Sequence, residues 1–130
     1  MIEGSCHCGA LRWSFDGVPD SATGCNCTLC RRYGTLWAYG HEDVDIRVSG
    51  PTRAYAFASK TIGFHFCPTC GCVAWWRSFT TNPEGRRRIA VNLRLADPAA
   101  VAGIVLDHFD GLTTFKDLPR DGRCVTDVWF

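Results

Sequence analysis

The cysteines of this chain constrain its fold more than any other feature. Nine occur in 130 residues, and eight of them fall into three short clusters. The clusters are Cys6-His7-Cys8, Cys25-Asn26-Cys27-Thr28-Leu29-Cys30 and Cys67-Pro68-Thr69-Cys70-Gly71-Cys72. Thiols that only filled a core would scatter at strand or helix periods, whereas spacings of two and three residues bring several thiols to one turn of backbone. The sequence therefore predicts metal-binding turns.

The third cluster predicts half of a closed metal site. Its pattern Cys67-Pro68-Thr69-Cys70-Gly71 is typical of a zinc knuckle, in which proline fixes the turn and glycine allows a positive φ. A knuckle supplies two ligands, and a structural zinc takes four. Cys6 and Cys8 are a matching pair, so we expect these two residues, with Cys67 and Cys70, to hold one structural zinc. Ligation by thiolates alone favours zinc over the hard cations.

The middle cluster predicts a second metal site of a different kind. Cys25, Cys27 and Cys30 supply three thiolates, and a zinc with three protein ligands keeps a position open for water or substrate. Two alternatives stay open: the site is closed by Cys72 or a histidine, or the chain holds one structural zinc and spare buried cysteines. Because Cys72 lies two residues past the knuckle, we expect its side chain to point away from the first zinc.

Length and charge restrict the class of protein. We expect one domain, residues 1–130, with a hydrophobic core. The formal net charge of +1 predicts no binding to nucleic acid, and no apolar run approaches the roughly 20 residues that span a membrane. The N-terminus lacks the basic and apolar regions of a secretory signal, and the odd cysteine count is unlike a secreted disulfide scaffold, so we expect a cytoplasmic location.

The pattern of apolar residues predicts an all-β, mainly antiparallel fold. We expect strands over residues 10–15, 35–39, 44–48, 55–57, 62–66, 73–79, 88–95, 104–108 and 124–129, and a short strand before Cys25. One helical turn is expected within residues 28–33, and a short helix begins at Pro98 with Asp97 as its N-cap. Cys124 is expected to be a small buried residue of the last strand.

Several motifs, taken in order, resemble one known family. The opening Gly4-Ser5-Cys6-His7-Cys8-Gly9-Ala10-Leu11-Arg12-Trp13 and the third motif Phe66-Cys67-Pro68-Thr69-Cys70-Gly71 are similar to motifs of the glutathione-dependent formaldehyde-activating (GFA), or centromere protein V, family. The second motif of that family usually reads Cys-His-Cys-Ser-x-Cys-Arg-Arg, and here it reads Cys25-Asn26-Cys27-Thr28-Leu29-Cys30-Arg31-Arg32. The stretches 91–98 and 117–119 also match, so the resemblance runs from Cys6 to at least Pro119.

The resemblance implies a zinc-clipped β-tent fold with two zinc ions per chain. It implies that the first and third motifs hold the structural zinc and that Cys25, Cys27 and Cys30 hold the catalytic one. The implied activity is that of a carbon–sulfur lyase in aldehyde detoxification, which joins glutathione to formaldehyde to give S-hydroxymethylglutathione. Asn26, Thr28 and Cys72 depart from the family's usual residues; they leave the metal ligands intact and bear on the substrate.

The substrate-binding residues are less well marked in the sequence. Glutathione carries two carboxylates, which arginine binds well, and Arg31 and Arg32 directly follow the last ligand of the middle cluster. We expect these two residues to bind the thiol substrate, which is glutathione or another low-molecular-weight thiol. The run Arg86–Arg88 is expected to be an exposed basic hairpin tip, and most aromatic residues to be core, with one or two at the open site.

Two rival functions remain at this point. A zinc-clipped β domain can be a non-catalytic module that binds a protein partner, with its second zinc closed; a homodimer is also compatible with the sequence. Methionine sulfoxide reductases of the B type have a related fold and a late catalytic cysteine, for which Cys124 beside Arg123 is the candidate. That family has an asparagine two residues after the cysteine, where this chain has Thr126. The reductase interpretation also leaves the middle cysteine cluster unexplained.

Overall fold

The computed structural model describes residues 1–57 and 60–129, which form two β-sheets and four short helical segments. The strands are β1 (Ile2–Ser5), β2 (Arg12–Phe15), β3 (Ala22–Cys25), β4 (Trp37–His41), β5 (Ile46–Ser49), β6 (Arg53–Tyr55), β7 (Ile62–Phe66), β8 (Val73–Ser78), β9 (Arg88–Asn92), β10 (Leu106–Asp110) and β11 (Lys116–Leu118). The α-helices are α1 (Cys30–Tyr33) and α2 (Pro98–Val101), and the 3₁₀ helices are η1 (Leu93–Leu95) and η2 (Val125–Val128). No helix among the described residues has the length or apolar character to cross a membrane.

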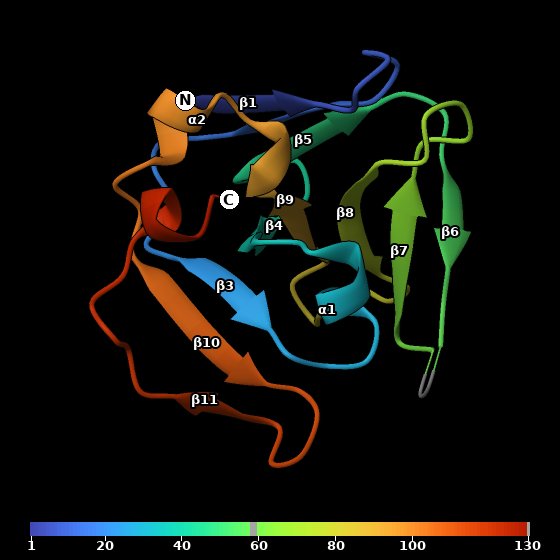
Figure 1. The fold of residues 1–130 in the computed structure, drawn as a ribbon. Helices are drawn as coiled ribbons and strands as arrows, with labels where there is room; N and C mark the ends of the chain where they lie inside the picture. The colour runs from blue at the N-terminus through green and yellow to red at the C-terminus, as the bar shows by residue number, and fades with distance from the viewer. Residues whose placement is uncertain (58–59, 130) are drawn as a thin grey trace.

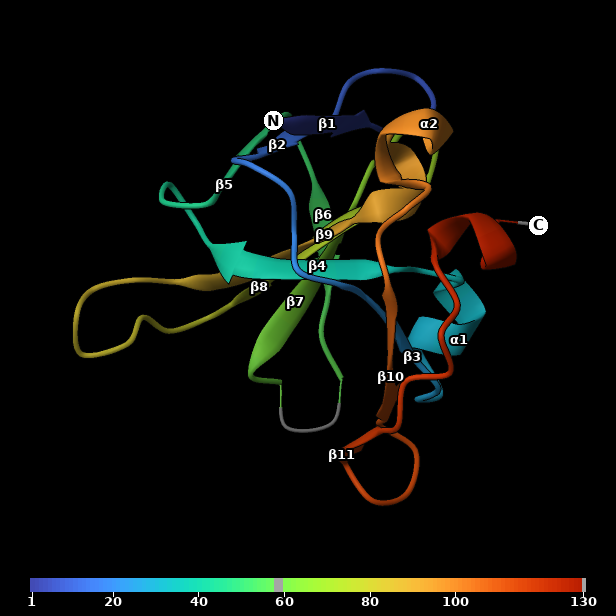
Figure 2. The same ribbon diagram turned by 90° about the vertical axis from the view of Figure 1, so that its left-hand side faces the viewer.

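The strands confirm the expected all-β, mainly antiparallel class (Figure 1). The smaller sheet has the order β1-β2-β5, and the larger has the order β11-β10-β3-β4-β9-β8-β7-β6. The pair β3–β10 is parallel, and the other ladders are antiparallel. In Figures 1 and 2, the β10–β11 hairpin and the β6–β7 hairpin lie at opposite ends of the larger sheet.

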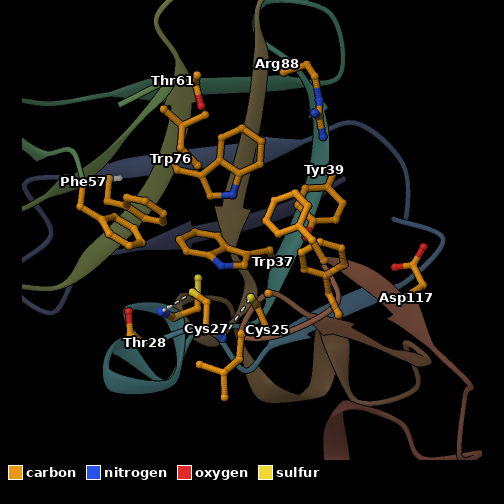
Figure 3. Close-up of a pocket in the computed structure, with 17 residues that line it drawn as sticks. Cys25, Cys27, Thr28, Trp37, Tyr39, Phe57, Thr61, Trp76, Arg88 and Asp117 are labelled. Atoms are coloured by element: carbon orange, nitrogen blue, oxygen red, sulfur yellow. Dashed lines mark hydrogen bonds between the residues drawn. The ribbon is translucent and has the colours of Figure 1, made fainter. Parts of the chain in front are cut away.

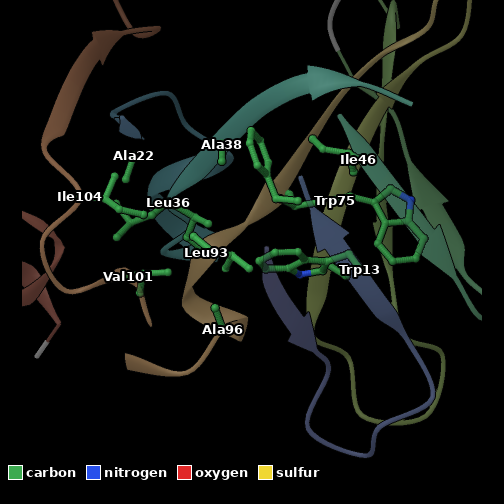
Figure 4. Close-up of a cluster of buried hydrophobic side chains, with 14 of the residues drawn as sticks. Trp13, Ala22, Leu36, Ala38, Ile46, Trp75, Leu93, Ala96, Val101 and Ile104 are labelled. Atoms are coloured by element: carbon green, nitrogen blue, oxygen red, sulfur yellow. The ribbon is translucent and has the colours of Figure 1, made fainter. Parts of the chain in front are cut away.

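The centre of the larger sheet is buried on both faces, so consecutive residues of β8 and β9 are buried. In β8, four successive residues from Val73 are buried, because side chains alternate between two clusters. Trp75 packs in the cluster that also contains Trp13 of the smaller sheet, shown in Figure 4. Trp76 packs on the other face with Trp37 and one of the cysteines, Cys30. The second face therefore carries the middle cysteine cluster.

The strand expected over residues 55–57 lies earlier, as β6 over Arg53–Tyr55, and two further strands were not expected from the sequence. The strand β1 pairs with β2 over Ile2–Ser5, although Ile2 is the only large apolar residue in it. The strand β11 has three exposed residues and is held by pairing with β10. Neither segment shows clear apolar alternation, so long-range pairing decides their structure.

The strand expected over residues 88–95 is wrong for residues 93–95, which form a 3₁₀ helix. The strand β9 ends at Asn92, whose side chain accepts a hydrogen bond from the backbone N–H of Arg94 and begins the 3₁₀ turn η1. The same asparagine also binds the backbone of Leu36 and Val73, at 3.3 and 2.9 Å. A capping side chain competes here with continued strand pairing.

The expected last strand is also wrong. Residues 125–128 form the 3₁₀ helix η2, and Cys124 is its half-buried N-cap rather than a buried strand residue. The Asp127 carboxylate accepts a 2.8 Å hydrogen bond from the Cys124 backbone N–H, which closes a capping box. The helix α2 confirms its prediction, with the Asp97 side chain accepting from the Ala99 N–H and Pro98 in the first turn.

Candidate metal centres and the adjoining cavity

The structure brings Cys6, Cys8, Cys67 and Cys70 together as the sequence predicts. Their sulfur atoms all lie within 4.8 Å of one another. The Cys8 sulfur is 3.6 Å from that of Cys6 and 3.5 Å from that of Cys67, its partner 59 positions away. We call these residues the four-cysteine group. It joins the turn between β1 and β2 to the turn between β7 and β8, and so links the two sheets.

The backbone of both turns is shaped for this group. Gly9 follows Cys8 with a φ of 82°, and Gly71 follows Cys70 with a φ of 80°, a region that disfavours residues with a Cβ. The backbone N–H of Cys70 donates to the Cys67 sulfur. The N–H groups of Cys72 and Cys8, donating to the Cys70 sulfur, lower its pKa to about 5. A lowered pKa favours the thiolate, which is the form that binds a metal.

The Cys72 thiol does not point away from this group, contrary to expectation. It lies in hydrogen-bond contact with the Cys70 thiol and the His7 backbone, outside the four sulfur atoms that cluster together. This position also excludes Cys72 as the residue that closes the middle cluster. His7 is exposed in its turn.

Cys25, Cys27 and Cys30 form a second set of sulfur atoms within 4.8 Å of one another, which we call the three-cysteine group. Cys25 ends β3, and Cys30 begins α1. Short local bonds fold the segment: the Cys27 N–H donates to the Cys25 sulfur at 3.4 Å, and the Cys30 N–H donates to the Cys27 sulfur at 3.2 Å. Among the described residues this group holds three potential ligands and no histidine or carboxylate.

The three thiols are electrostatically unequal. A hydrogen bond from Cys30, with the backbone N–H groups of Cys27 and Gly111, lowers the pKa of Cys25 to about 6. The pKa of Cys30 is raised, because its thiol donates to Cys25 and because it is buried. The cluster thus favours a thiolate at Cys25 even without a bound cation.

The three-cysteine group opens into a cavity of about 700 Å³. Seven of its 17 lining residues are aromatic, and Figure 3 shows the Trp37 ring next to Cys25 and Cys27, with the Trp76 ring beyond it. Trp37 and Trp76 are 1% and 7% exposed, so they form a buried floor. The β10–β11 hairpin supplies the opposite wall through Phe109, Leu112 and Phe115, and Gly111 and Asp117 of the same segment also line the cavity. The expectation that one or two aromatics border the open site is too low, because seven aromatic residues line the cavity.

Two charged side chains line the cavity, Arg88 and Asp117, both at the margin of the view in Figure 3. The Arg88 guanidinium lies over the Trp76 ring, 5.5 Å from its centroid. Among the described residues, it has no carboxylate partner within 4.0 Å. Arg31 and Arg32, expected to bind substrate, lie exposed on α1, and neither is among the lining residues. Arg32 instead donates to the Thr28 carbonyl at 2.6 Å.

A hydrogen-bonded network fixes the hairpin against the cysteine loop. The Asn26 amide donates to the Asp110 carboxylate at 3.0 Å, and its carbonyl accepts from the Leu112 N–H at 3.0 Å. Asp110 also accepts from the N–H groups of Thr113 and Thr114 and from the Thr114 hydroxyl. These hydrogen bonds hold the pKa of the Asp110 carboxyl well below its usual range, and the bond from Asn26 has the largest effect. Asn26, which departs from the family's usual histidine, therefore joins the loop of the three-cysteine group to the cavity wall.

Close packing at Gly111 tightens the same contact. A Cβ at this position would lie 2.7 Å from the Cys25 sulfur and 3.0 Å from the Cys27 Cβ. Glycine is therefore required for the hairpin to approach the thiols.

The sequence did not reveal Gly111, Phe115 and Asp117 as site residues, because only the pairing of β10 with β3 brings them to the site. The position of Arg88 carried a signal: period two places it on the same face of β9 as Ala90, which packs with Trp76.

The donor atoms of both groups fit zinc. All are thiol sulfurs, which suit zinc and not the hard cations. With zinc–sulfur bonds of about 2.3 Å, a tetrahedral site needs sulfur atoms about 3.8 Å apart. The separations of 3.5 and 3.6 Å in the four-cysteine group are close to that value.

The fold and the two cysteine groups define a β-sheet protein with two candidate metal centres, one of which opens into an aromatic cavity. The profile of the glutathione-dependent formaldehyde-activating enzyme family matches residues 1–102, and the chain belongs to this family. The stretch 117–119, also noted as similar, lies beyond the matched residues.

Individual proteins that are similar to the chain include a curated relative and a solved structure. One, from Halomonas elongata, is provisionally named a glutathione-dependent formaldehyde-activating enzyme; it is 29% identical over 86 residues. That match covers 58% of this chain and 55% of the relative, so it spans about half of the relative's length. The other is a crystal structure of a Rhodobacter sphaeroides protein, which is 26% identical with a TM-score of 0.59. The match covers 80% of this chain and 98% of that one, and it supports the fold.

Proposed function

We propose that this protein is a zinc-dependent carbon–sulfur lyase that acts on adducts of a low-molecular-weight thiol with an aldehyde, of the S-hydroxymethylglutathione synthase type. The observation that carries the proposal is the contrast in ligand number: four thiols cluster in one group, and three cluster beside a cavity in the other. A metal site with three protein ligands leaves a position for a substrate atom. The family and the name of the Halomonas relative support glutathione and formaldehyde as the substrate class.

In the proposed reaction, the thiol sulfur forms a bond with the carbonyl carbon. The π electrons of the carbonyl move to its oxygen, and that oxygen takes up the proton that the thiol lost. A zinc ion held by Cys25, Cys27 and Cys30 would supply Lewis acidity, either lowering the pKa of the incoming thiol or polarising the carbonyl. The reverse reaction breaks the same carbon–sulfur bond.

The protein's own residues supply binding and shielding. Three thiolates with one Zn²⁺ leave a net negative site, so the Arg88 guanidinium at the cavity margin offsets charge and suits a carboxylate of the thiol substrate. Trp37 and Trp76 exclude water from the reacting atoms. The N–H groups of Cys27, Cys30 and Gly111 hold the sulfur atoms in place. A role for Arg31 and Arg32 in binding the thiol stays a prediction.

The test is the rate of adduct formation with zinc-loaded protein, measured by proton exchange NMR on glutathione and formaldehyde with the spontaneous rate subtracted. We expect acceleration by the wild type and its loss in Cys27→Ser. Cys124→Ser is the matched control, because Cys124 lies outside both cysteine groups, and it should keep the rate. No acceleration by the wild type, or full acceleration by Cys27→Ser, would contradict the proposal and favour a non-catalytic binding module.

A further inference from the structure

The cavity is built for more than a one-carbon aldehyde. Its volume of about 700 Å³ falls in the range of pockets that enclose drug-sized ligands. The hydroxymethyl group that formaldehyde adds to a thiol needs little of this space and gains nothing from aromatic walls. Next to the three-cysteine group, the β10–β11 hairpin contributes three apolar side chains to the lining, those of Phe109, Leu112 and Phe115.

Phe115 is the most unusual part of that wall. It has a φ of 56°, in the left-handed region that bulky residues avoid, and its side chain is 75% exposed. Its ring meets Phe109 edge-on at a centroid distance of 5.0 Å. A strained backbone that presents a large apolar side chain to solvent does not stabilise the fold, and such features cluster at ligand contacts.

The hairpin tip that carries Phe115 is firmly held. The Phe115 N–H donates to the Asp110 carbonyl at 2.7 Å, and the Asp110 carboxylate binds the two threonines that precede Phe115. The Asn26 carbonyl binds the N–H of Leu112, which also lines the cavity and is 54% exposed. Phe109, Leu112 and Phe115 therefore form a fixed apolar surface next to the three-cysteine group.

The charges divide the cavity further. Arg88 has no carboxylate partner among the described residues and suits a carboxylate of the thiol. The hairpin contributes the apolar side chains of Phe109, Leu112 and Phe115, and its one charged lining residue is Asp117, which pairs with Phe109. A substrate with a charged thiol part and an apolar aldehyde part matches this division.

We propose that the cavity takes thiol adducts whose aldehyde-derived carbon bears an aromatic or aliphatic group, and that Phe109, Leu112 and Phe115 bind this group. The inference rests on the proposed function, because it assigns the aldehyde part of the same substrate. Phe115 is then a specificity-determining residue. It selects among adducts and takes no part in bond formation.

The test uses stable thioether analogues of the adducts, S-methylglutathione and S-hexylglutathione, titrated calorimetrically into zinc-loaded protein. Each fully buried methylene strengthens binding by roughly fourfold, so even partial burial of the hexyl chain should make S-hexylglutathione bind at least tenfold more tightly. Equal affinity for both analogues would overturn this inference and leave the proposed function standing. Binding of neither would overturn both.

Phe115→Asn locates the apolar surface, because asparagine tolerates a positive φ and the variant keeps the backbone. We expect it to weaken S-hexylglutathione binding at least threefold and to change S-methylglutathione binding less than twofold. Leu118→Asn is the matched control: Leu118 is a 45% exposed apolar residue of the same hairpin that is absent from the cavity lining, and both affinities should stay unchanged. Unchanged hexyl binding in Phe115→Asn, or an effect confined to its oligomeric state, would overturn the assignment.

Discussion

The four-cysteine group and the three-cysteine group present the same ligand atoms in opposite structural settings. The first joins Cys8 to Cys67 across 59 positions and connects two sheets. The second lies within six residues, between the end of β3 and the start of α1, and borders a cavity. A metal that closes a long loop contributes to folding, whereas one held by a single local segment can be lost with the sheets intact. The comparison predicts that stability and function divide between the two groups.

The largest effect is expected from Cys67→Ser. Cys67 is 1% exposed and belongs to the group that joins the sheets. Losing the metal there should lower the free energy of unfolding by more than about 3 kcal/mol, measured by denaturant titration followed by circular dichroism. Cys72→Ser is the control, because its thiol touches Cys70 but lies outside the group, and it should unfold close to the wild-type midpoint. If Cys67→Ser unfolds at the wild-type midpoint, the four-cysteine group does not stabilise the fold.

Gly111→Ala should damage the functional region and spare the rest of the fold. The new Cβ would collide with Cys25 and Cys27, so either the hairpin or the cysteine loop must move, at a cost of about 1–3 kcal/mol. We expect at least a tenfold loss of lyase rate and weaker zinc binding at the three-cysteine group. In Gly103→Ala nothing lies within 4 Å of the added Cβ, so this variant should behave like the wild type. If the two alanine variants react at the same rate, the hairpin does not position the site.

Gly71→Ala isolates the backbone of the knuckle. No atom lies within 4 Å of the added Cβ, so the φ of 80° is the one obstacle, and the expected cost is about 1–2 kcal/mol of stability with the lyase rate unchanged. Gly9→Ala, with a φ of 82° in the matching turn, should show a similar cost. Thermal unfolding and the lyase rate of both variants check this prediction. A lower lyase rate with unchanged stability would show that the knuckle serves function rather than stability.

The smallest effect is expected from Asn26→Ala. It removes the hydrogen bond to Asp110 and the acceptor for the Leu112 N–H, at a cost of about 1 kcal/mol because Asn26 is exposed. The loosened hairpin should raise the KM for the thiol substrate more than it lowers kcat. Asn82→Ala removes a half-buried side-chain cap in the β8–β9 turn and should leave both constants unchanged. Equal kinetic effects of the two variants would show that Asn26 has no special role.

Local patterns in the sequence predict the metal groups and most of the strands. Cysteine spacing is local information, and the four-plus-three division follows from ligand counting before any contact is known. Period-two alternation likewise locates strands such as β5 and β7. What the sequence could not provide depends on contacts between distant segments. The hairpin that carries Gly111 and Phe115 reaches the thiols through the parallel pairing of β10 with β3.

Arg31 and Arg32, which the sequence predicts to bind substrate, show the same limit: neither is among the residues that line the cavity. Arg31 and Arg32 are adjacent to a ligand in sequence, but the helix α1 turns them outward. Arg88 is 58 positions beyond Cys30 in the chain and yet lines the same cavity. Proximity in sequence predicted which cysteines cluster, because each turn brings its own thiols together, and it predicted the wall of a large cavity poorly.

The most direct test of the division is metal content and thermal stability in two matched double variants. Zinc per chain and the unfolding temperature should be measured for the wild type, Cys25→Ser/Cys27→Ser and Cys6→Ser/Cys8→Ser. We expect two zinc ions in the wild type, and one in Cys25→Ser/Cys27→Ser with an unfolding temperature within a few degrees of the wild type. Cys6→Ser/Cys8→Ser should show no cooperative unfolding. Equal losses of stability in the two variants, or a single zinc in the wild type, would contradict the division.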